Sequence, residues 1–252
     1  MEIGLVIQGP VVSYGQGPNN NRLGFDAVKV VRENIRNLTP HAAQTVVSTW
    51  EGSGLDIRDA GSTVVLLENR PPAWRDHDNR QKQFISTYEG AKWLANNTHV
   101  SHIVKIRTDQ LVPPWLFDWL QAFFASEAGA FSGDGAEQER FLVFSDMLPT
   151  VPFYAGDFIL GGTRSDFLSF CEANLRYGRR NLHPVIGVDY VLKYLSLSDE
   201  RFSEAFYRRV PYIWQTANRR NASAHGYWEA VRRSRCAVIP RQLFASIVWR
   251  DR

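Results

Sequence analysis

The stretch IVKIRTDQL, residues 103–111, is an apolar run that ends in three polar residues, Arg107, Thr108 and Asp109. Side chains two residues apart on an extended strand lie on the same face, so we expect Arg107 and Asp109 side by side and Thr108 on the opposite face. The guanidinium group of an arginine binds phosphate or carboxylate groups, and an aspartate can hold a metal ion or accept the proton of a hydroxyl group. The triplet is therefore either a surface turn or the rim of a site for an anionic ligand.

Polar residues also follow other apolar runs of strand length. In an open α/β sheet, ligands bind beyond the carboxyl ends of the strands. Each polar cluster alone is compatible with a plain turn, but together they outline the edge of a polar crevice in which a tryptophan can pack against a flat ring. The clusters besides 107–109 are Gln8, Gly9 and Pro10; Ser48, Thr49, Trp50 and Glu51; and Glu68, Asn69 and Arg70.

The elements that must position these residues follow an alternating pattern. Apolar, β-branched runs predict strands at residues 3–8, 44–49, 62–68, 102–106 and 140–145, and helical spacing of apolar residues predicts helices at 26–38, 79–95 and 115–125. The later part predicts helices at 164–177 and 188–197 and a strand at 236–239. This alternation predicts an α/β fold with a largely parallel, Rossmann-like central sheet flanked by helices, followed by an aromatic and Arg-rich C-terminal part.

The composition and motifs exclude several classes of protein. The 252 residues are 44% hydrophobic, which suits one enzyme-sized domain over residues 1–252. The chain lacks the phosphate loop of classical ATPases, the G-x-S-x-G of hydrolases and the H-E-x-x-H of zinc proteases. Apolar runs fall short of the roughly 18 residues of a membrane span, and no signal peptide is evident, so we expect a cytoplasmic protein with reduced Cys171 and Cys236.

The last 52 residues carry an excess of positive charge. From Arg201 to Arg252 the sequence has 11 Arg and no Lys against three acids, an excess of 11 − 3 = 8. Such a tail can attract anionic lipid head groups, a phosphorylated substrate or nucleic acid, or it can be a solvated and partly ion-paired surface. We expect no nucleic acid, and we keep peripheral contact with the inner face of a membrane as a hypothesis.

Five short motifs occur in an order that resembles the WavE-like lipopolysaccharide-synthesis family. They are IQGPV, VVSTW, NRQKQFIST, VKIRTD and FSDMLPTVPFYAGDFILGG, and the resemblance covers about residues 3–195. It implies a GT-A-like fold and a glycosyltransferase that moves a sugar from a nucleotide-sugar donor to a saccharide or lipid-linked saccharide acceptor of the bacterial surface. Residues 1–145 would then bind the donor, and residues 146–252 would form the acceptor side and the basic tail.

The resemblance also implies roles for individual residues. Arg107 and Asp109 would take the place of the family's D-x-D motif, with Asp157 as the first candidate for the catalytic base and Asp189 as the second. A helix N-terminus favours anions, so residues at the start of the helix near position 79 would reach the diphosphate or sugar. The implied donor-binding residues are Gln8, Gly9 and Pro10 beside the nucleotide; Ser48, Thr49 and Trp50 beside base and ribose; and Asn79, Arg80 and Gln81 at the helix start.

Dependence on a metal ion is open at this stage. Asp109 is the candidate ligand for Mg²⁺ or Mn²⁺, but a single carboxylate makes a poor site unless Glu51 or Asp157 joins it. The positive charge of Arg107 favours weak or absent metal dependence. Two other classes remain as alternatives: a non-catalytic nucleotide- or carbohydrate-binding module of the same fold, and a nucleic-acid-binding protein that uses the Arg-rich tail.

Overall fold

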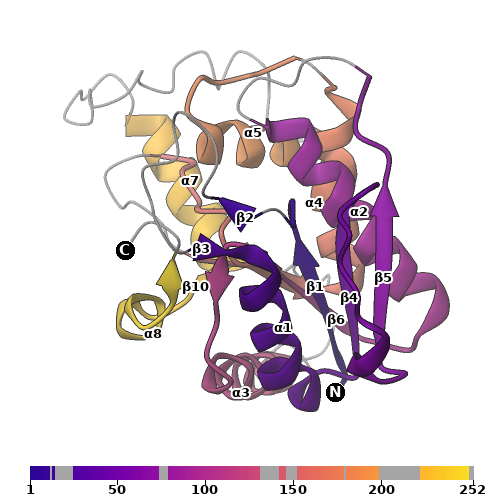
Figure 1. The fold of residues 1–252 in the computed structure, drawn as a ribbon. Coiled ribbons are helices and arrows are strands. Elements are labelled where there is room, and N and C mark those ends of the chain that lie inside the picture. Colours follow the sequence, from indigo (N-terminus) through magenta and orange to yellow (C-terminus); the bar gives the residue numbers. More distant parts are fainter. Residues whose placement is uncertain are drawn as a thin grey trace.

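The computed structural model describes residues 1–11, 13–14, 25–73, 79–130, 142–145, 152–178, 180–198 and 222–249. A seven-stranded sheet runs through this part of the chain, in the order β10-β8-β9-β6-β1-β4-β5 (Figure 1). The strands are β1 (Ile3–Gln8), β4 (Gln44–Trp50), β5 (Val64–Asn69), β6 (His102–Arg107), β8 (Leu142–Phe144), β9 (Leu160–Thr163) and β10 (Cys236–Val238).

The sheet is parallel except at β9. Strand β1 pairs in parallel with β4 on one side and β6 on the other, and β4 pairs in parallel with β5. Strand β9 pairs antiparallel with both β6 and β8, and β10 is parallel to β8. The predicted largely parallel α/β sheet is therefore confirmed, and β9 is the strand of this sheet that the sequence analysis did not predict.

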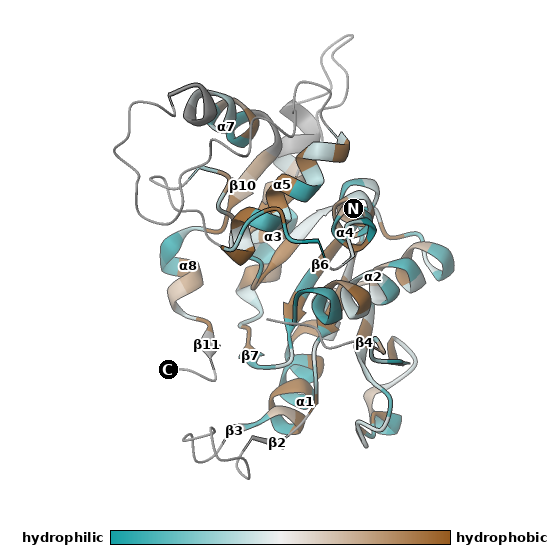
Figure 2. Cartoon of the chain, turned by 90° about the horizontal axis from the view of Figure 1, so that it is seen from above, coloured by the Kyte–Doolittle hydropathy of each residue, from teal (hydrophilic) through white to brown (hydrophobic). Residues whose placement is uncertain are grey.

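Helices cover both faces of the sheet, and the alternation of β1 shows how the two cores are separated. Val6 belongs to a hydrophobic cluster with residues of α2, α4, α5 and α7, whereas Leu5 and Ile7 belong to a second cluster with residues of α1 and α3. The helices are α1 (Ala27–Leu38), α2 (Arg80–Asn97), α3 (Trp115–Ala130), α4 (Arg164–Arg176), α5 (Ile186–Ser198), α7 (Ala222–Arg235) and α8 (Arg241–Ala245). In Figure 2, α1 and α2 each carry both hydrophobic and hydrophilic residues, as helices that cover a sheet must.

Short elements complete the fold. Two-stranded pairings join β2 (Ser13–Tyr14) to β3 (Phe25–Asp26) and β7 (Gln110–Leu111) to β11 (Val248–Trp249). Two 3₁₀ turns, Thr39–His41 and Arg58–Ala60, lie before β4 and β5. Within the described ranges, no helix is long and apolar enough to cross a membrane.

The predicted element boundaries hold with small shifts. The helix predicted at 26–38 begins at Ala27, because the Asp26 carboxylate caps it by accepting hydrogen bonds from the Val28 and Lys29 N–H groups at 2.9 and 3.2 Å. Strand β4 continues to Trp50, and α5 begins two residues earlier than predicted, at Ile186. The predicted strand at 140–145 appears as Leu142–Phe144, and residues 140–141 lie outside the described ranges.

Candidate functional site

The carboxyl ends of β1, β4 and β6 and the start of α2 enclose a cavity of about 400 Å³, which we call the strand-end cavity. This is the edge of the sheet where a parallel α/β fold is expected to bind ligands. Most of the residues predicted from the sequence meet here, although they come from four separate parts of the chain. The lining residues are Gln8, Gly9, Pro10, Trp50, Asn79, Lys82, Gln83, Arg107, Thr108 and Asp109.

The floor of the strand-end cavity is a close approach between the ends of β1 and β6. The Gly9 N–H donates to the Ser48 carbonyl at 3.2 Å, the Thr108 N–H donates to the Gln8 carbonyl at 3.0 Å, and the Thr108 hydroxyl donates to the Pro10 carbonyl at 2.9 Å. Gly9 has φ +134°, and a Cβ there would lie 2.7 Å from the Thr108 Oγ1 atom. A side chain at position 9 would therefore disturb the floor.

The predicted position of Thr108, on the opposite face from Arg107 and Asp109, is wrong. The alternation of an extended strand would direct it away from Arg107 and Asp109, but it lines the same cavity. The reason is that β6 ends at Arg107 and the chain turns at Thr108 and Asp109.

Arg107 and Asp109 form a two-point ion pair. The Arg107 Nε atom lies 2.8 Å from Asp109 Oδ1, and Arg107 Nη2 lies 2.7 Å from Asp109 Oδ2. The guanidinium carbon also lies 5.3 Å from the centre of the Phe158 ring, which adds a cation–π contact. Both carboxylate oxygens are thus engaged by one cation, in the fork geometry that orients an arginine best.

This pairing bears on whether a metal ion fits. A divalent cation at Asp109 would have to compete with the Arg107 guanidinium for both oxygens. Glu51, one of the two acids considered as a second metal ligand, accepts a hydrogen bond from Arg70 Nε at 3.1 Å and is half exposed. Among the residues that the structure describes, no group of three or more His, Cys, Asp or Glu could hold a metal ion. The described donor set therefore does not fit Mg²⁺ or Mn²⁺, and dependence on a metal stays an untested prediction.

Another part of the cavity lining is the first turn of α2. Asn79 precedes this helix in a left-handed conformation with φ 56°, and its side chain makes no capping hydrogen bond. The first N–H groups of a helix have no partner within the helix, and the helix dipole adds positive potential there. Lys82 adds a positively charged side chain to this part of the lining. The start of α2 is therefore suited to an anionic group.

Lys82 and Gln83 are lining residues that the sequence analysis missed. It assigned the run Asn79, Arg80 and Gln81, whereas residues three and four apart share a face of a helix. From Asn79, that spacing leads to Lys82 and Gln83. Helical periodicity was thus the signal that could have found them.

Arg80 and Asp189 lie in a buried network away from the cavity. The Arg80 Nη1 atom is 3.1 Å from Asp189 Oδ2, and Lys193 Nζ is 2.8 Å from the same oxygen. The exposed fractions of the three side chains are 4%, 0% and 1%. The donor-binding role predicted for Arg80 and the catalytic role predicted for Asp189 are not supported, because neither side chain reaches the strand-end cavity.

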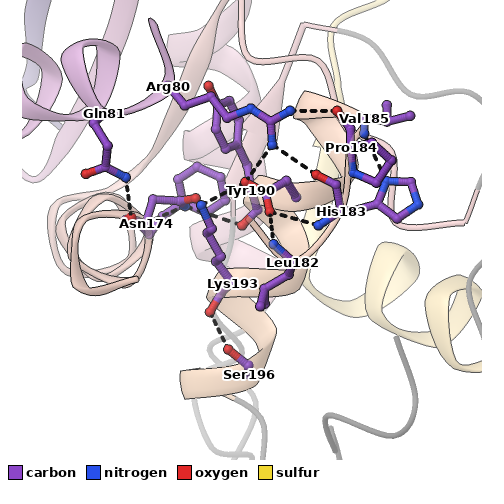
Figure 3. Close-up of polar contacts among 12 residues, drawn as sticks. Arg80, Gln81, Asn174, Leu182, His183, Pro184, Val185, Tyr190, Lys193 and Ser196 are labelled. Carbon is purple, nitrogen blue, oxygen red and sulfur yellow. Dashed lines mark hydrogen bonds and ion pairs between the residues drawn. The ribbon is translucent and has the colours of Figure 1, made fainter. Parts of the chain in front are cut away.

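The same network fixes the turn that leads into α5 (Figure 3). Arg80 donates to the carbonyls of His183 and Pro184 at 2.9 and 2.6 Å, and Asp189 Oδ1 accepts from the N–H groups of Leu182 and His183 at 2.6 and 3.1 Å. These contacts join the start of α2 to the start of α5. Their effect is structural: they hold the helix whose first turn forms a wall of the cavity.

Three other predicted residues are buried away from the cavity. The Ser48 hydroxyl is buried, donates to the Ser86 carbonyl at 2.6 Å and accepts from Asn69 Nδ2 at 2.9 Å. The Thr49 side chain is fully buried, and Gln81 donates to the Asn174 carbonyl at 3.3 Å. None of the three lines the strand-end cavity, so the donor-binding role predicted for Ser48, Thr49 and Gln81 is not supported. Trp50, at the end of β4, is the residue of that cluster that reaches it.

Asp157 lies just before β9, in contact with the lining residue Gln83. Gln83, which lines the cavity, donates through Nε2 to the Asp157 Oδ2 atom. Lys105 of β6 donates through Nζ to the Asp157 carbonyl at 2.6 Å. Burial lowers the pKa of Lys105 to about 8, and the negative charge of Asp157 acts in the opposite direction. The predicted base is thus connected to the cavity through Gln83, and it is not itself a lining residue.

Three solved structures are similar to the chain at low identity. The 4-diphosphocytidyl-2C-methyl-D-erythritol synthase of Anaerococcus prevotii has 10% identity and a TM-score of 0.45, over 77% of this chain and 82% of that chain. A cytidylyltransferase from Leptospira borgpetersenii has 15% identity and a TM-score of 0.43, over 80% and 74%. A glycosyltransferase involved in the glycosylation of the major capsid of PBCV-1 has 9% identity and a TM-score of 0.42, over 95% and 81%. No curated protein matches the chain.

The family comparison agrees with the motifs. The WavE family, described by its role in lipopolysaccharide synthesis, matches residues 3–197. This range contains all the strand-end residues and α2, and it ends close to the end of α5. The chain belongs to the WavE lipopolysaccharide-synthesis family.

Proposed function

We propose that the protein is a glycosyltransferase that binds a nucleotide-sugar donor in the strand-end cavity. The observation that supports this most is the meeting of three features in about 400 Å³: the Arg107 guanidinium, the N-terminus of α2 with Lys82, and the indole of Trp50. A nucleoside diphosphate needs cationic and N–H groups for its phosphates and a flat apolar surface for its base. These are the features that the cavity provides.

The roles of the lining residues follow from this placement. Arg107 and the first turn of α2 stabilise the negative charge that develops on the departing diphosphate. Trp50 packs against the base, while Gln8, Gly9 and Pro10 let the backbone approach the nucleotide closely. In this proposal the acceptor hydroxyl lies outside the donor cavity, on the Asp157 side of Gln83, where the Asp157 carboxylate removes its proton.

The acceptor in this proposal is a saccharide or lipid-linked saccharide of the bacterial surface. Membership of a lipopolysaccharide-synthesis family supports that class of acceptor. A lipid-linked acceptor would bring the protein to the inner face of the membrane as a peripheral protein.

A thermal-shift panel tests donor binding. UDP, GDP, CMP and dTDP nucleotides and their sugars are added to the wild type and to Arg107→Ala, with Arg36→Ala as the control. Arg36 is 74% exposed, pairs with Glu33 and does not line the cavity. We expect one nucleotide class to raise the melting temperature of the wild type and the control, and to have a much smaller effect on Arg107→Ala. If no nucleotide stabilises the wild type, the proposed donor site is wrong.

Turnover separates the enzyme from a non-catalytic module. The nucleotide that binds is offered as its sugar conjugate, with a saccharide acceptor, in Mn²⁺ and in EDTA. Acceptor-dependent release of the nucleotide, a nucleoside diphosphate or, from a CMP-sugar, CMP, supports transfer, and binding without release would instead favour the non-catalytic module. Full activity in EDTA would support the cationic role of Arg107, whereas complete loss of activity would show that the reaction needs a metal ion.

A further inference from the structure

Asp157 is held at two points by side chains from two different elements. Gln83 of α2 donates to its carboxylate, and Lys105 of β6 donates to its backbone carbonyl at 2.6 Å. We propose that Gln83 and Lys105 are positioning residues for Asp157, with Gln83 fixing the carboxylate beside the strand-end cavity and Lys105 fixing the backbone that carries it. This inference rests on the proposed function, because it assumes that Asp157 is the base.

The backbone at Asp157 needs such support. Residues 152–157 precede β9, and the ladder between β9 and β6 begins at Leu160, which pairs with Lys105. A further backbone contact links this stretch to the end of β8: the Ser145 N–H donates to the Gly156 carbonyl at 3.3 Å. The Lys105 ammonium therefore extends the link between β6 and this segment beyond the end of the ladder.

The presence of a buried lysine at position 105 indicates a role for this residue in the site. Lys105 is 1% exposed, so its ammonium group gives up hydration that an apolar side chain of similar length would not have to give up. A methionine would fill much the same volume, and what the lysine adds is a charged donor to Asp157. The charged side chains near it are Asp157, Asp109 and Arg107, of which Asp109 and Arg107 line the cavity, and the buried Cys171 thiol of α4 also lies near it. A buried cation placed there belongs to the site more than to the apolar core.

The hydrogen bond from Gln83 involves only one of the two carboxylate oxygens of Asp157. Gln83 Nε2 engages Asp157 Oδ2, so the other oxygen, Oδ1, is the one that accepts the proton in the proposed reaction. The acceptor oxygen then forms a bond to the anomeric carbon, and the bond between that carbon and the phosphate oxygen breaks. The electron pair of that bond leaves with the nucleoside diphosphate. An amide donor suits this arrangement because it orients the carboxylate without adding a proton that could be transferred.

A double-mutant cycle tests the proposal. Donor Kd, kcat and KM for the acceptor are measured for the wild type, Lys105→Met, Asp157→Asn and the double variant. A misplacement of about 1 Å can cost roughly a hundredfold in rate, so we expect Lys105→Met to lower kcat about 10- to 100-fold and to change the donor Kd less than twofold. In the Asp157→Asn background, where no base remains to be positioned, Lys105→Met should have almost no further effect on kcat.

One control and one alternative variant complete the test. Lys92→Met removes a lysine from the exposed face of α2 and should leave kcat unchanged. If Lys105→Met does not fold, Gln83→Leu takes its place in the same cycle, with kcat as the readout. Equal losses of kcat in both backgrounds, or a wild-type kcat in Lys105→Met, would overturn the inference. Absence of donor binding to the wild type would instead overturn the proposed function, so the two failures are distinguishable.

Discussion

Replacement of Asp189 by asparagine tests whether this residue anchors the structure or acts as a base. Asparagine has nearly the same shape, and its Oδ1 can still accept from the N–H groups of Leu182 and His183. Its amide nitrogen, however, would face Arg80 Nη1 and Lys193 Nζ, which lie 3.1 and 2.8 Å from Asp189 Oδ2. The substitution therefore removes one buried negative charge from between two buried positive charges.

The expected loss of stability is large. Removing one partner of a buried ion pair destabilises a protein by about 3–5 kcal/mol, because the remaining charge loses its compensation. A domain of this kind unfolds with a total of about 5–15 kcal/mol, so the variant should lose a considerable part of its stability. Adding Lys193→Met should restore part of it, since one of the two buried cations is then absent.

Urea denaturation followed by tryptophan fluorescence measures this change. Asp118→Asn serves as the control, because this carboxylate is 62% exposed and its substitution should change the unfolding free energy by no more than about 0.5 kcal/mol. Arg80 keeps its hydrogen bonds to the His183 and Pro184 carbonyls in Asp189→Asn, so the start of α2 stays in place, and donor turnover per folded molecule should stay within about twofold of the wild type in both variants. An Asp189→Asn protein with wild-type stability and a hundredfold loss of turnover would refute the structural role.

Two further predictions concern Gly9, in the floor of the strand-end cavity, and the buried Lys105. Gly9→Ala should cost about 1–3 kcal/mol of stability and weaken nucleotide binding, because φ is +134° and the new methyl group would meet Thr108 Oγ1; urea denaturation and calorimetry measure the two effects. Lys105 has a folded-state pKa of about 8, below its ordinary value of 10.5, so the folded state binds fewer protons than the unfolded state between these pH values. Relative to Lys105→Met, the unfolding free energy of the wild type should therefore rise by about 3 kcal/mol as pH increases from 7 to 10.5, and a flat difference would contradict the buried charge.

The strand ends could be predicted from the sequence, because apolar runs followed by polar residues have a direct physical meaning. Gln8, Trp50 and Arg107 follow buried strands, and parallel strands bring their carboxyl ends to one edge of a sheet. Strand β9 was missed because its four residues, LGGT, have too few β-branched or aromatic side chains to indicate a strand. Its pairing comes from its neighbours β6 and β8.

The buried network could not be predicted in the same way. Arg80 and Asp189 are 109 positions apart, and a single sequence does not show that the starts of α2 and α5 meet. A charged residue near a helix start is compatible with a ligand contact, a cap or a buried ion pair. The structure distinguishes these by burial, since the Asp189 side chain has no exposed surface.

The pairing of Arg107 with Asp109 changes what the R-x-D arrangement implies. Two acids in a D-x-D motif bring negative charge that a metal ion must bridge to the diphosphate. In this chain, Arg107 stands at the position that the resemblance gives to the first acid of the motif. The Asp109 carboxylate binds the Arg107 guanidinium through both of its oxygens. An arginine side chain is flexible, so a cation that acts on a leaving group must be held in place before the reaction. In the proposed site, Asp109 therefore orients Arg107 at the cavity, and we propose that this ion pair takes the place of a metal ion at the diphosphate.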